Sequence, residues 1–235
     1  MEPEQISAAE SLTGTEEGAR GATSELRLQP ALKRALDVVL SALSLLALAP
    51  LLGAIALAVR LDSGGPVVFR QERLGLQGKR FTILKFRTMY ADSDDGPHKE
   101  AMQRVVEGVR TDLPEGTQSF KSLYDARITR VGKFLRKWNL DELPQLLNVL
   151  RGEMSLVGPR PALEYELPLY KDWYHGRFAM RPGLTGLWQV KRSEAGNLDE
   201  MMAFDIRYVE SFSLWLDVKL IAMTIPAIVR EKGRF

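Results

Sequence analysis

Cysteine is absent from this chain of 235 residues, and histidine occurs only twice, as His98 and His175. The lack of cysteine excludes disulfides and thiolate metal centres, and two histidines leave little for a histidine-based metal site. No glycine-rich Walker loop and no GxGxxG segment is present, so a standard nucleotide-binding fold lacks support. The net charge is only +2, a balance that does not indicate a nucleic-acid binder.

Large apolar side chains are also scarce in residues 1–28, which are rich in Glu, Ser, Gly and Ala. Such a composition cannot bury enough apolar surface to offset the entropy of ordering, so we predict a disordered N-terminal tail. The stretch lacks the basic start and apolar middle of a signal peptide, so it is not a secretion signal.

One segment concentrates the hydrophobic residues, because no charge occurs from Val38 to Val59. As a straight helix this run would be about 33 Å long, enough to cross a bilayer. Pro50 lies near its middle, where a proline removes a backbone donor and clashes with the preceding turn. Basic residues flank both ends, namely Lys33 and Arg34 before the run and Arg60, Arg70 and Arg73 after it.

Three arrangements fit this segment, which we bound at residues 29–62. The positive-inside tendency places both basic flanks in the cytoplasm, and a helix that enters the membrane, breaks at Pro50 and returns satisfies it. A kinked transmembrane span is an open alternative. A buried helical hairpin is the weaker third option, because few core helices run so long without a charge.

Residues 66–89 predict a β-hairpin, with strands at 66–70 and 80–88 and a turn that contains Gly75 and Gly78. By the two-residue period of a strand, Lys85 and Arg87 point to the same side, about 7 Å apart. This pair is either a solvated strand face or an anion clamp near the membrane surface.

A helical pattern covers residues 127–138, where apolar residues recur at three-to-four spacing: Val131, Phe134, Leu135 and Trp138. Asp141 and Glu142 follow, and Pro144 suits the first turn of a second helix that begins near Asp141 and stops at Gly152. The positive end of a helix stabilises a charged carboxylate, and an ionised Asp is a competent nucleophile toward phosphorus. An N-cap Asp followed by a favourable first-turn Glu is the plainer alternative.

Further helices are predicted at 165–178, 201–210 and 213–229. The last suits either an amphipathic helix lying on the membrane or a core helix. Turn-rich loops are predicted at 155–161 and 181–189. The predicted fold class is therefore α+β, mainly α: a helix-break-helix membrane segment, a β-hairpin and a compact domain with interfacial amphipathic helices.

Several basic residues in or beside these rigid elements could converge on a diphosphate, and Arg offers a planar fork for phosphate oxygens. They are Lys85, Arg87, Arg127, Arg136 and Arg160. Glu142 could hold a divalent cation against the diphosphate, since Mg²⁺ typically takes one or two carboxylates together with phosphate oxygens.

These blocks resemble the bacterial sugar transferases, the monotopic phosphoglycosyl transferases that begin glycan assembly on undecaprenyl phosphate. The LDELPQL and VGPRP blocks, in that order after a membrane segment, are highly specific. The matching stretches, from Leu32 to Arg230, are KRALD, the run broken at Pro50, FRQERLG, FTILKFRTM, DARITRVGKFLRKWNLDELPQLLNVLRGEMSLVGPRP, RPGLTGLWQV and YVESFSLWLDVKL.

The resemblance implies a two-step mechanism. Asp141 would attack the sugar-bearing phosphorus of a UDP-sugar, release UMP and pass the phosphosugar to undecaprenyl phosphate. Glu142 would bind Mg²⁺, and Lys85, Arg136 and Arg160 would contact phosphates. The resemblance also implies a re-entrant helix on the cytoplasmic face of the bacterial inner membrane and a cytoplasmic catalytic domain at 63–235.

The segment GLWQVKRSEAG resembles that of members that transfer hexose-1-phosphate, galactose or glucose, which makes Trp188 and Gln189 candidate contacts for the sugar or nucleotide. Two residues depart from the family pattern. Lys191 replaces an expected small residue, and Ala49 precedes Pro50 where many members have a Ser whose hydroxyl could help the bend.

The resemblance further implies exopolysaccharide, O-antigen or capsule synthesis as the setting. Membrane lipids and other glycan-assembly enzymes would be partners, and a homodimer is left open. Two other functions are compatible with the same residues. A non-catalytic membrane scaffold would need only the anchor and a folded domain, and a lipid-phosphate hydrolase would let water accept the phosphosugar.

Overall fold

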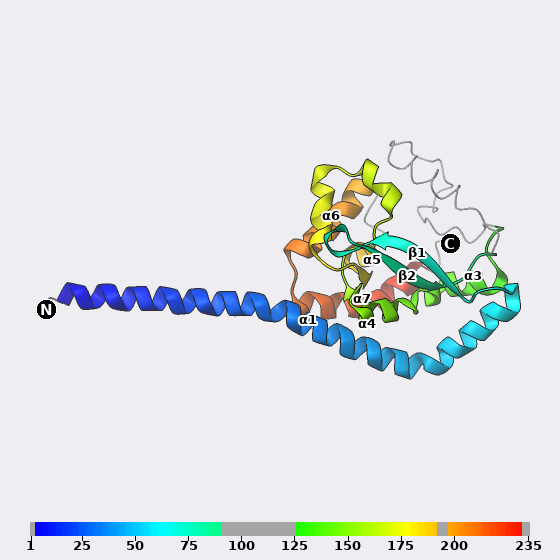
Figure 1. The fold of residues 1–235 in the computed structure, drawn as a ribbon, viewed down its shortest axis with the longest axis horizontal. Coiled ribbons are helices and arrows are strands. Elements are labelled where there is room, and N and C mark those ends of the chain that lie inside the picture. Colours follow the sequence, from blue (N-terminus) through cyan, green and yellow to red (C-terminus); the bar gives the residue numbers. More distant parts are fainter. Residues whose placement is uncertain (1–2, 91–125, 192–196, 232–235) are drawn as a thin grey trace.

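The computed structural model describes residues 3–90, 126–191 and 197–231, with side chains for 29–90, 126–191 and 197–228. The predicted disorder of residues 1–28 concerns a stretch without described side chains and stays a prediction. Helices predominate, as the sequence predicts (Figure 1), and they are α1 (Pro3–Ser63), α3 (Arg130–Lys137), α4 (Gln145–Arg151), α5 (Leu187–Lys191), α6 (Leu198–Glu210) and α7 (Leu214–Glu231). Short 3-10 segments join them, namely η1 (Leu76–Gly78), η2 (Leu140–Glu142), η3 (Glu164–Leu169) and η4 (Asp172–Ala179).

Two small sheets accompany the helices. Strands β1 (Val68–Leu74) and β2 (Arg80–Phe86) pair antiparallel around η1, which confirms the predicted hairpin. Strands β3 (Ser155–Val157) and β4 (Gly183–Thr185) pair in parallel. The prediction of plain loops at 155–161 and 181–189 was therefore wrong, because three-residue strands are too short to show a two-residue period.

The segment predicted as one helix at 165–178 is two 3-10 segments, η3 and η4. Pro168 lies inside η3, and the backbone is extended at Tyr170 and Lys171 between the two. A proline lacks the backbone donor that a continuous α-helix needs at that position. The predicted helices at 201–210 and 213–229 are confirmed as α6 and α7, with slightly wider bounds.

Helix α1 carries the apolar run. Its stretch Gln29–Ser63 has a mean hydropathy of 2.4 and is long and apolar enough to cross a membrane, and only 11% of its most apolar window is buried. The helix stays helical through Pro50 and is bent where its colour in Figure 1 corresponds to residues near 50. The predicted break is thus a bend within one helix, as expected where a proline removes one backbone hydrogen bond.

The charged residues before the apolar run bind the folded domain. The Lys33 ammonium lies 2.5 Å from Asp217 Oδ2 on α7 and donates to the Val157 carbonyl of β3 at 3.0 Å. Tyr208 donates its hydroxyl to the other oxygen of Asp217 at 2.7 Å. Burial raises the pKa of the Asp217 carboxyl, while Lys33 and Tyr208 act in the opposite direction by favouring its charged form.

Two further residues of the same turn extend this contact. Asp37 accepts a hydrogen bond from the backbone N–H of Leu156 in β3 at 3.0 Å. Arg34 donates to the carbonyls of Val149 and Leu150, at 2.6 and 2.9 Å, in the last turn of α4. A cation at this end of a helix satisfies its unpaired carbonyls and complements its dipole.

The other end of α1 binds the same domain. Asp62 accepts from the backbone N–H of Val131 in the first turn of α3 at 3.0 Å, which complements the positive end of that helix. Arg87 donates to the Ser63 hydroxyl at 2.8 Å and to the Gly64 carbonyl. Ile55 and Val59 are buried in one core cluster with residues of β2 and α3. Both ends of the apolar segment are therefore bonded to one folded unit.

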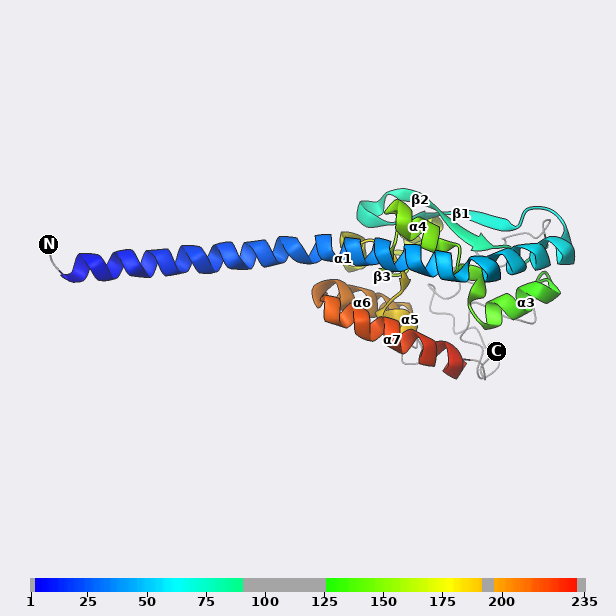
Figure 2. The same ribbon diagram turned by 90° about the horizontal axis from the view of Figure 1, so that it is seen from below.

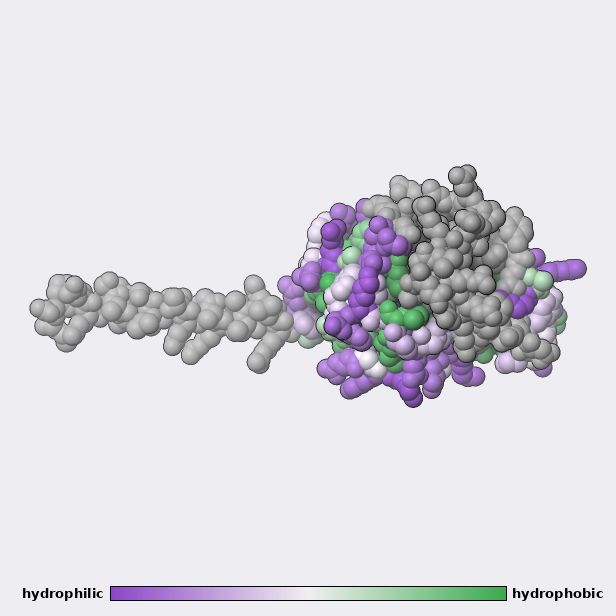
Figure 3. Space-filling model, turned by 90° about the horizontal axis from the view of Figure 1, so that it is seen from above, coloured by the Kyte–Doolittle hydropathy of each residue, from purple (hydrophilic) through white to green (hydrophobic). Residues whose placement is uncertain are grey.

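Helices line the underside of the molecule. Figure 2 shows α1 lying across it, next to α4, α3 and α7. Figure 3 shows the opposite face, where hydrophilic side chains line most of the coloured rim. Exposed large apolar side chains are carried by α1 (Leu36, Val39, Leu40, Leu43, Leu46, Leu51, Leu57, Leu61), α3 (Phe134, Trp138) and α7 (Trp215, Val218, Ile221, Ile225).

The bond between Lys33 and Asp217 gives a prediction about stability. Replacing Lys33→Met leaves the Asp217 carboxylate buried without its cation, so the free energy of unfolding should fall by about 3 kcal/mol. For a chain of this size, the thermal midpoint in detergent should drop by roughly 6–12 °C. Lys219→Met on the exposed side of α7 is the matched control and should leave the midpoint unchanged. Equal midpoints for the two variants would contradict this interpretation.

Candidate active site

The two adjacent carboxylates, Asp141 and Glu142, lie in a tight turn between two helices. Helix α3 ends at Lys137, and Asn139 then adopts a left-handed conformation with φ 53°. Asn tolerates this conformation better than most residues. The acids follow in η2, and α4 begins only at Gln145, after Pro144 as its cap. A helical turn therefore does begin near Asp141, as predicted, but it is a 3-10 turn, and the α-helix itself starts only at Gln145. The predicted stop at Gly152 is confirmed, with φ 82°.

The turn buries one acid and presents the other. Asp141 is only 4% exposed, and Glu142 is half-buried. Glu142 Oε1 lies 3.0 Å from the Lys85 ammonium on β2, and both side chains keep about a quarter of their surface exposed. An ion pair with this exposure is weak enough to exchange partners. The structure thus brings Lys85, a predicted phosphate ligand, to Glu142.

Arg136 lies near the same end of β2. Its Nε donates to the hydroxyl of Thr88 at 2.8 Å, and Thr88 is three residues beyond Lys85. The other two predicted phosphate ligands are placed differently. Arg87 is bonded to the end of α1, as described above, and is buried. Arg127 is half-buried, and its carbonyl accepts from the Tyr90 backbone N–H at 3.0 Å.

A buried asparagine fixes the acidic turn to the hairpin. Asn148 on α4 accepts from the Leu84 N–H at 3.0 Å and donates to the Thr82 carbonyl at 2.7 Å, so it bonds to two backbone groups along one edge of β2, close to Lys85. It also donates to Glu153 at 2.6 Å. Its full burial makes these bonds expensive to leave unmade.

Arg160 lies in a second group of residues. Its guanidinium lies 3.9 Å from Glu166 Oε1 and over the ring of Trp188, 5.7 Å from the ring centroid. Trp188 is itself buried in a core cluster with Tyr174 and two methionines, and the neighbouring Gln189 on α5 is half-buried. The structure therefore brings two predicted site residues, Arg160 and Trp188, into contact, and the Trp188 ring lies beneath the guanidinium.

Arg73 on β1 is a site residue that the sequence analysis missed. Burial and the nearby charge of Arg160 lower the pKa of Arg73 to about 10, so it stays charged at neutral pH, and Glu166 and Glu142 act in the opposite direction. Arg73 also donates to the Pro161 carbonyl at 3.2 Å. Charges in both the acidic turn (Glu142) and the second group (Arg160 and Glu166) therefore influence the pKa of Arg73. The predicted strand ended at residue 70, whereas β1 continues to Leu74 and carries Arg73.

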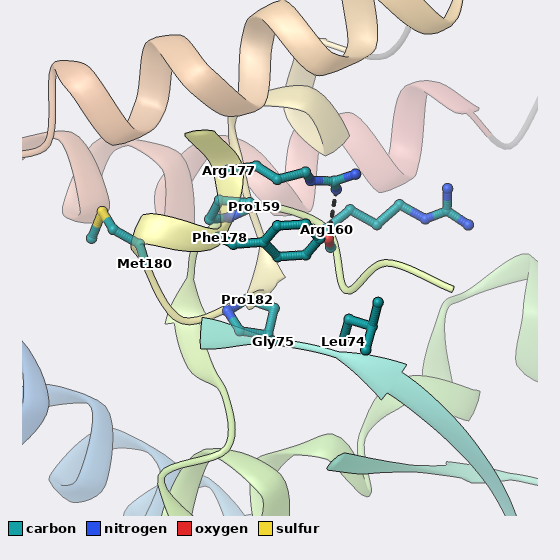
Figure 4. A pocket seen from close by; sticks show the side chains of 8 residues that line it. All are labelled: Leu74, Gly75, Pro159, Arg160, Arg177, Phe178, Met180 and Pro182. Atoms are coloured by element: carbon teal, nitrogen blue, oxygen red, sulfur yellow. Dashed lines mark hydrogen bonds between the residues drawn. The ribbon is translucent and has the colours of Figure 1, made fainter. Parts of the chain in front are cut away.

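A small cavity lies beside Arg160 (Figure 4). The figure shows the Arg160 side chain extending away from Phe178 and Met180, while its carbonyl accepts a bond from Arg177. The cavity is lined by Leu74, Gly75, Pro159, Arg160, Arg177, Phe178, Met180 and Pro182. Apart from the two arginines, the residues that line the cavity carry no charge. The Arg160 side chain extends from the cavity toward Glu166.

The arrangement suits the handling of phosphate. A buried carboxylate lies next to a second one that pairs with a lysine, and arginines lie in both neighbouring groups. Among the described residues no group of three or more His, Asp or Glu side chains could hold a metal by itself. The adjacent pair Asp141 and Glu142 fits Mg²⁺, which usually completes its shell with substrate phosphates and water.

Comparison with known proteins extends these observations. The family model described as bacterial sugar transferase matches residues 28–231. The exopolysaccharide production protein ExoY of Sinorhizobium fredii is 40% identical over 203 residues, which cover 86% of this chain and 88% of that protein. The UDP-glucose:undecaprenyl-phosphate glucose-1-phosphate transferase of Caulobacter vibrioides is 44% identical, over 86% of this chain and 72% of that protein. The undecaprenyl-phosphate galactose phosphotransferase of Salmonella typhimurium is 39% identical, and the match covers 87% of this chain but only 42% of that longer protein.

The role of Asn148 gives a second prediction. Asn148→Leu keeps the side-chain volume but leaves the buried Leu84 N–H without its acceptor and removes the bond to the Thr82 carbonyl. The free energy of unfolding should fall by about 2–4 kcal/mol, measured by denaturant unfolding in detergent. Arg151→Gln, an exposed change on the same helix, should alter it by no more than about 0.5 kcal/mol. A fully stable Asn148→Leu variant would show that these bonds do not hold the turn.

Proposed function

Because the chain belongs to the bacterial sugar transferase family, we propose that it transfers a sugar-1-phosphate from a UDP-sugar to undecaprenyl phosphate. The observation that carries the proposal is the turn with Asp141 and Glu142, held against Lys85 on the domain that also binds both ends of the apolar helix. The names of the relatives from Caulobacter and Salmonella support the donor and acceptor classes.

The proposed chemistry has two steps. A carboxylate oxygen of Asp141 attacks the sugar-bearing phosphorus, the bond from that phosphorus to the bridging oxygen breaks, and UMP leaves. An oxygen of the lipid phosphate then attacks the same phosphorus, and the bond to Asp141 breaks. The products are the lipid diphosphosugar and the free carboxylate. Burial of Asp141 restricts access of water to the intermediate, which favours transfer over hydrolysis.

The basic residues of the site would receive the charge of the diphosphate. Lys85, which pairs with Glu142, and Arg136, near the same end of β2, would bind it beside the acids. Arg160 and Arg73 supply a second positive region. Glu142, next to Asp141, would hold Mg²⁺, and the ion would neutralise charge on the phosphate oxygens.

The sugar is proposed to be a hexose of the glucose or galactose type. Of the three relatives described above, the one from Caulobacter is named for glucose and the one from Salmonella for galactose. The relative from Sinorhizobium is named for exopolysaccharide production. The proposed setting is therefore the first, lipid-linked step of a surface polysaccharide. Trp188 supports Arg160 from below, so its proposed contribution to sugar or nucleotide binding is through that arginine.

The proposed membrane arrangement is a re-entrant α1 with the catalytic domain on the cytoplasmic face. The bonds of Lys33 at one end of the apolar segment and of Asp62 at the other to the same domain support this arrangement. The bend near Pro50 would turn the helix back toward the cytoplasmic face. The exposed stripe of α7, from Trp215 to Ile225, would lie in the interface beside it.

The first test of this function is the nucleophile. Asp141→Asn removes the charge at nearly constant shape, so release of UMP from UDP-glucose or UDP-galactose should fall at least about a thousandfold. The phosphosugar adduct, detected by intact-protein mass spectrometry, should disappear. Retained turnover in this variant would refute the role of Asp141.

Controls for that test separate chemistry from folding. Asp172→Asn, at an exposed carboxylate of η4, should keep the wild-type rate. Chelation of divalent cations should stop turnover of the wild-type protein, and added Mg²⁺ should restore it. Turnover that survives chelation would remove the proposed metal from the mechanism.

The second test concerns topology. Tags placed at residues 28 and 235 should both be accessible from the cytoplasm and not from the periplasm, because α1 enters and leaves on one side. Protease or antibody accessibility in spheroplasts and in inverted vesicles measures this. Opposite accessibility of the two tags would mean that α1 spans the membrane.

A further inference from the structure

A buried ion pair holds the backbone of Arg160. Arg177 on η4 and Asp205 on α6 meet with Nη2 and Oδ2 2.6 Å apart, and their side chains are only 2% and 1% exposed. The pair lies far along the chain from the acidic turn, and none of the chemistry proposed above uses it.

Both members of the pair bond to the main chain of Arg160. Asp205 Oδ2 accepts from the Arg160 N–H at 3.2 Å, and Arg177 Nη2 donates to the Arg160 carbonyl at 2.6 Å. Figure 4 shows the second of these bonds. Arg160 has prolines on both sides, and neither Pro159 nor Pro161 has an N–H to donate. The ion pair therefore supplies fixed partners for both polar backbone groups of this one residue.

Arg177 is also linked to the side chain of Arg160, through Tyr170 and Glu166. Arg177 Nη1 donates to the Tyr170 hydroxyl at 2.7 Å, and that hydroxyl donates to Glu166 Oε2 at 3.1 Å. The other oxygen of Glu166 lies 3.9 Å from Arg160 Nη1. Backbone and guanidinium of Arg160 are thus both tied to Arg177.

Stability alone does not explain such a pair. Two charges lose their hydration when buried, and an apolar pair of similar volume is often as stable or more stable. What an apolar pair could not supply is the two directed bonds to the Arg160 backbone. We infer that Arg177 and Asp205 are positioning residues that fix Arg160 so that its guanidinium meets the diphosphate of the donor. The inference rests on the proposed function, which gives Arg160 a phosphate to bind.

The test replaces the pair by apolar residues, because a single change would leave one buried charge and could unfold the protein. The double variant Arg177→Met with Asp205→Leu should keep the wild-type thermal midpoint but raise KM for the UDP-sugar about tenfold. In an Arg160→Ala background, the same double change should add nothing further, because the residue it positions is gone. An unchanged KM, or an equal tenfold rise in both backgrounds, would overturn the inference.

A second measurement does not depend on activity. Hydrogen exchange of the Arg160 amide in the full chain should be about tenfold faster in the double variant, since its acceptor is lost. Unchanged protection would overturn the inference whatever the enzyme does. Lys171→Gln is the matched control, because the exposed pair of Lys171 and Asp199 also joins the η4 region to α6, and it should change neither KM nor exchange.

These readouts keep two failures apart. If the wild-type chain transfers no sugar phosphate from UDP-glucose or UDP-galactose, the proposed function fails, and amide exchange still decides whether the pair holds Arg160. If the wild-type chain is active and Arg160→Ala is impaired, but the double variant binds donor normally, only the positioning role fails.

Discussion

The structure depends on one constraint, that both ends of the apolar segment of α1 are bonded to the same folded domain. Lys33 and Asp217 join its start to α7, and Asp62 joins its end to α3. A buried ion pair is a poor source of net stability but a good source of register, because its partners cannot slide without stranding a charge. With both ends fixed, α1 lies across one side of the domain next to α3 and α7, and all three helices carry exposed large apolar side chains. In the proposed membrane arrangement, the turn with Asp141 and Glu142 would lie on a domain that rests on the membrane surface.

The candidate site is assembled from residues far apart in the sequence around two short rigid pieces. Asn148 fixes the acidic turn to β2, so that Glu142 meets Lys85, and the loop with Arg160 is held by Arg73, Arg177 and Asp205. The charge of Arg73 is affected by both pieces, since Arg160 lowers its pKa and Glu142 acts in the opposite direction. A bound diphosphate would likewise contact both positive regions, the one with Lys85 and the one with Arg160. The membership of the chain in the bacterial sugar transferase family supports sugar-phosphate transfer as the chemistry of this site.

Local patterns predicted the local features well. The hairpin, the stop at Gly152 and helices α6 and α7 follow from turn residues and periodicity that lie within a few positions. The helix predicted to begin near Asp141 begins as a 3-10 turn after the left-handed Asn139, and α4 starts only at Gln145. Arg87 was paired with Lys85 by strand period, but it lies beyond the end of β2 and bonds to α1. The partners of Lys33, Asp62 and Arg177 could not be predicted, because no periodicity encodes a bond between residues so distant in sequence.

The constraint on α1 can be measured directly, since a chain without cysteine accepts spin labels only where they are introduced. One labelled pair would be Leu36→Cys with Lys219→Cys, and the other Leu61→Cys with Lys133→Cys, each joining one end of α1 to the domain. In lipid nanodiscs, both pairs should give a single short and narrow distance by pulsed electron resonance. A separation for the Leu61 pair that is longer by about 30 Å, the thickness of the hydrocarbon core, would contradict the account.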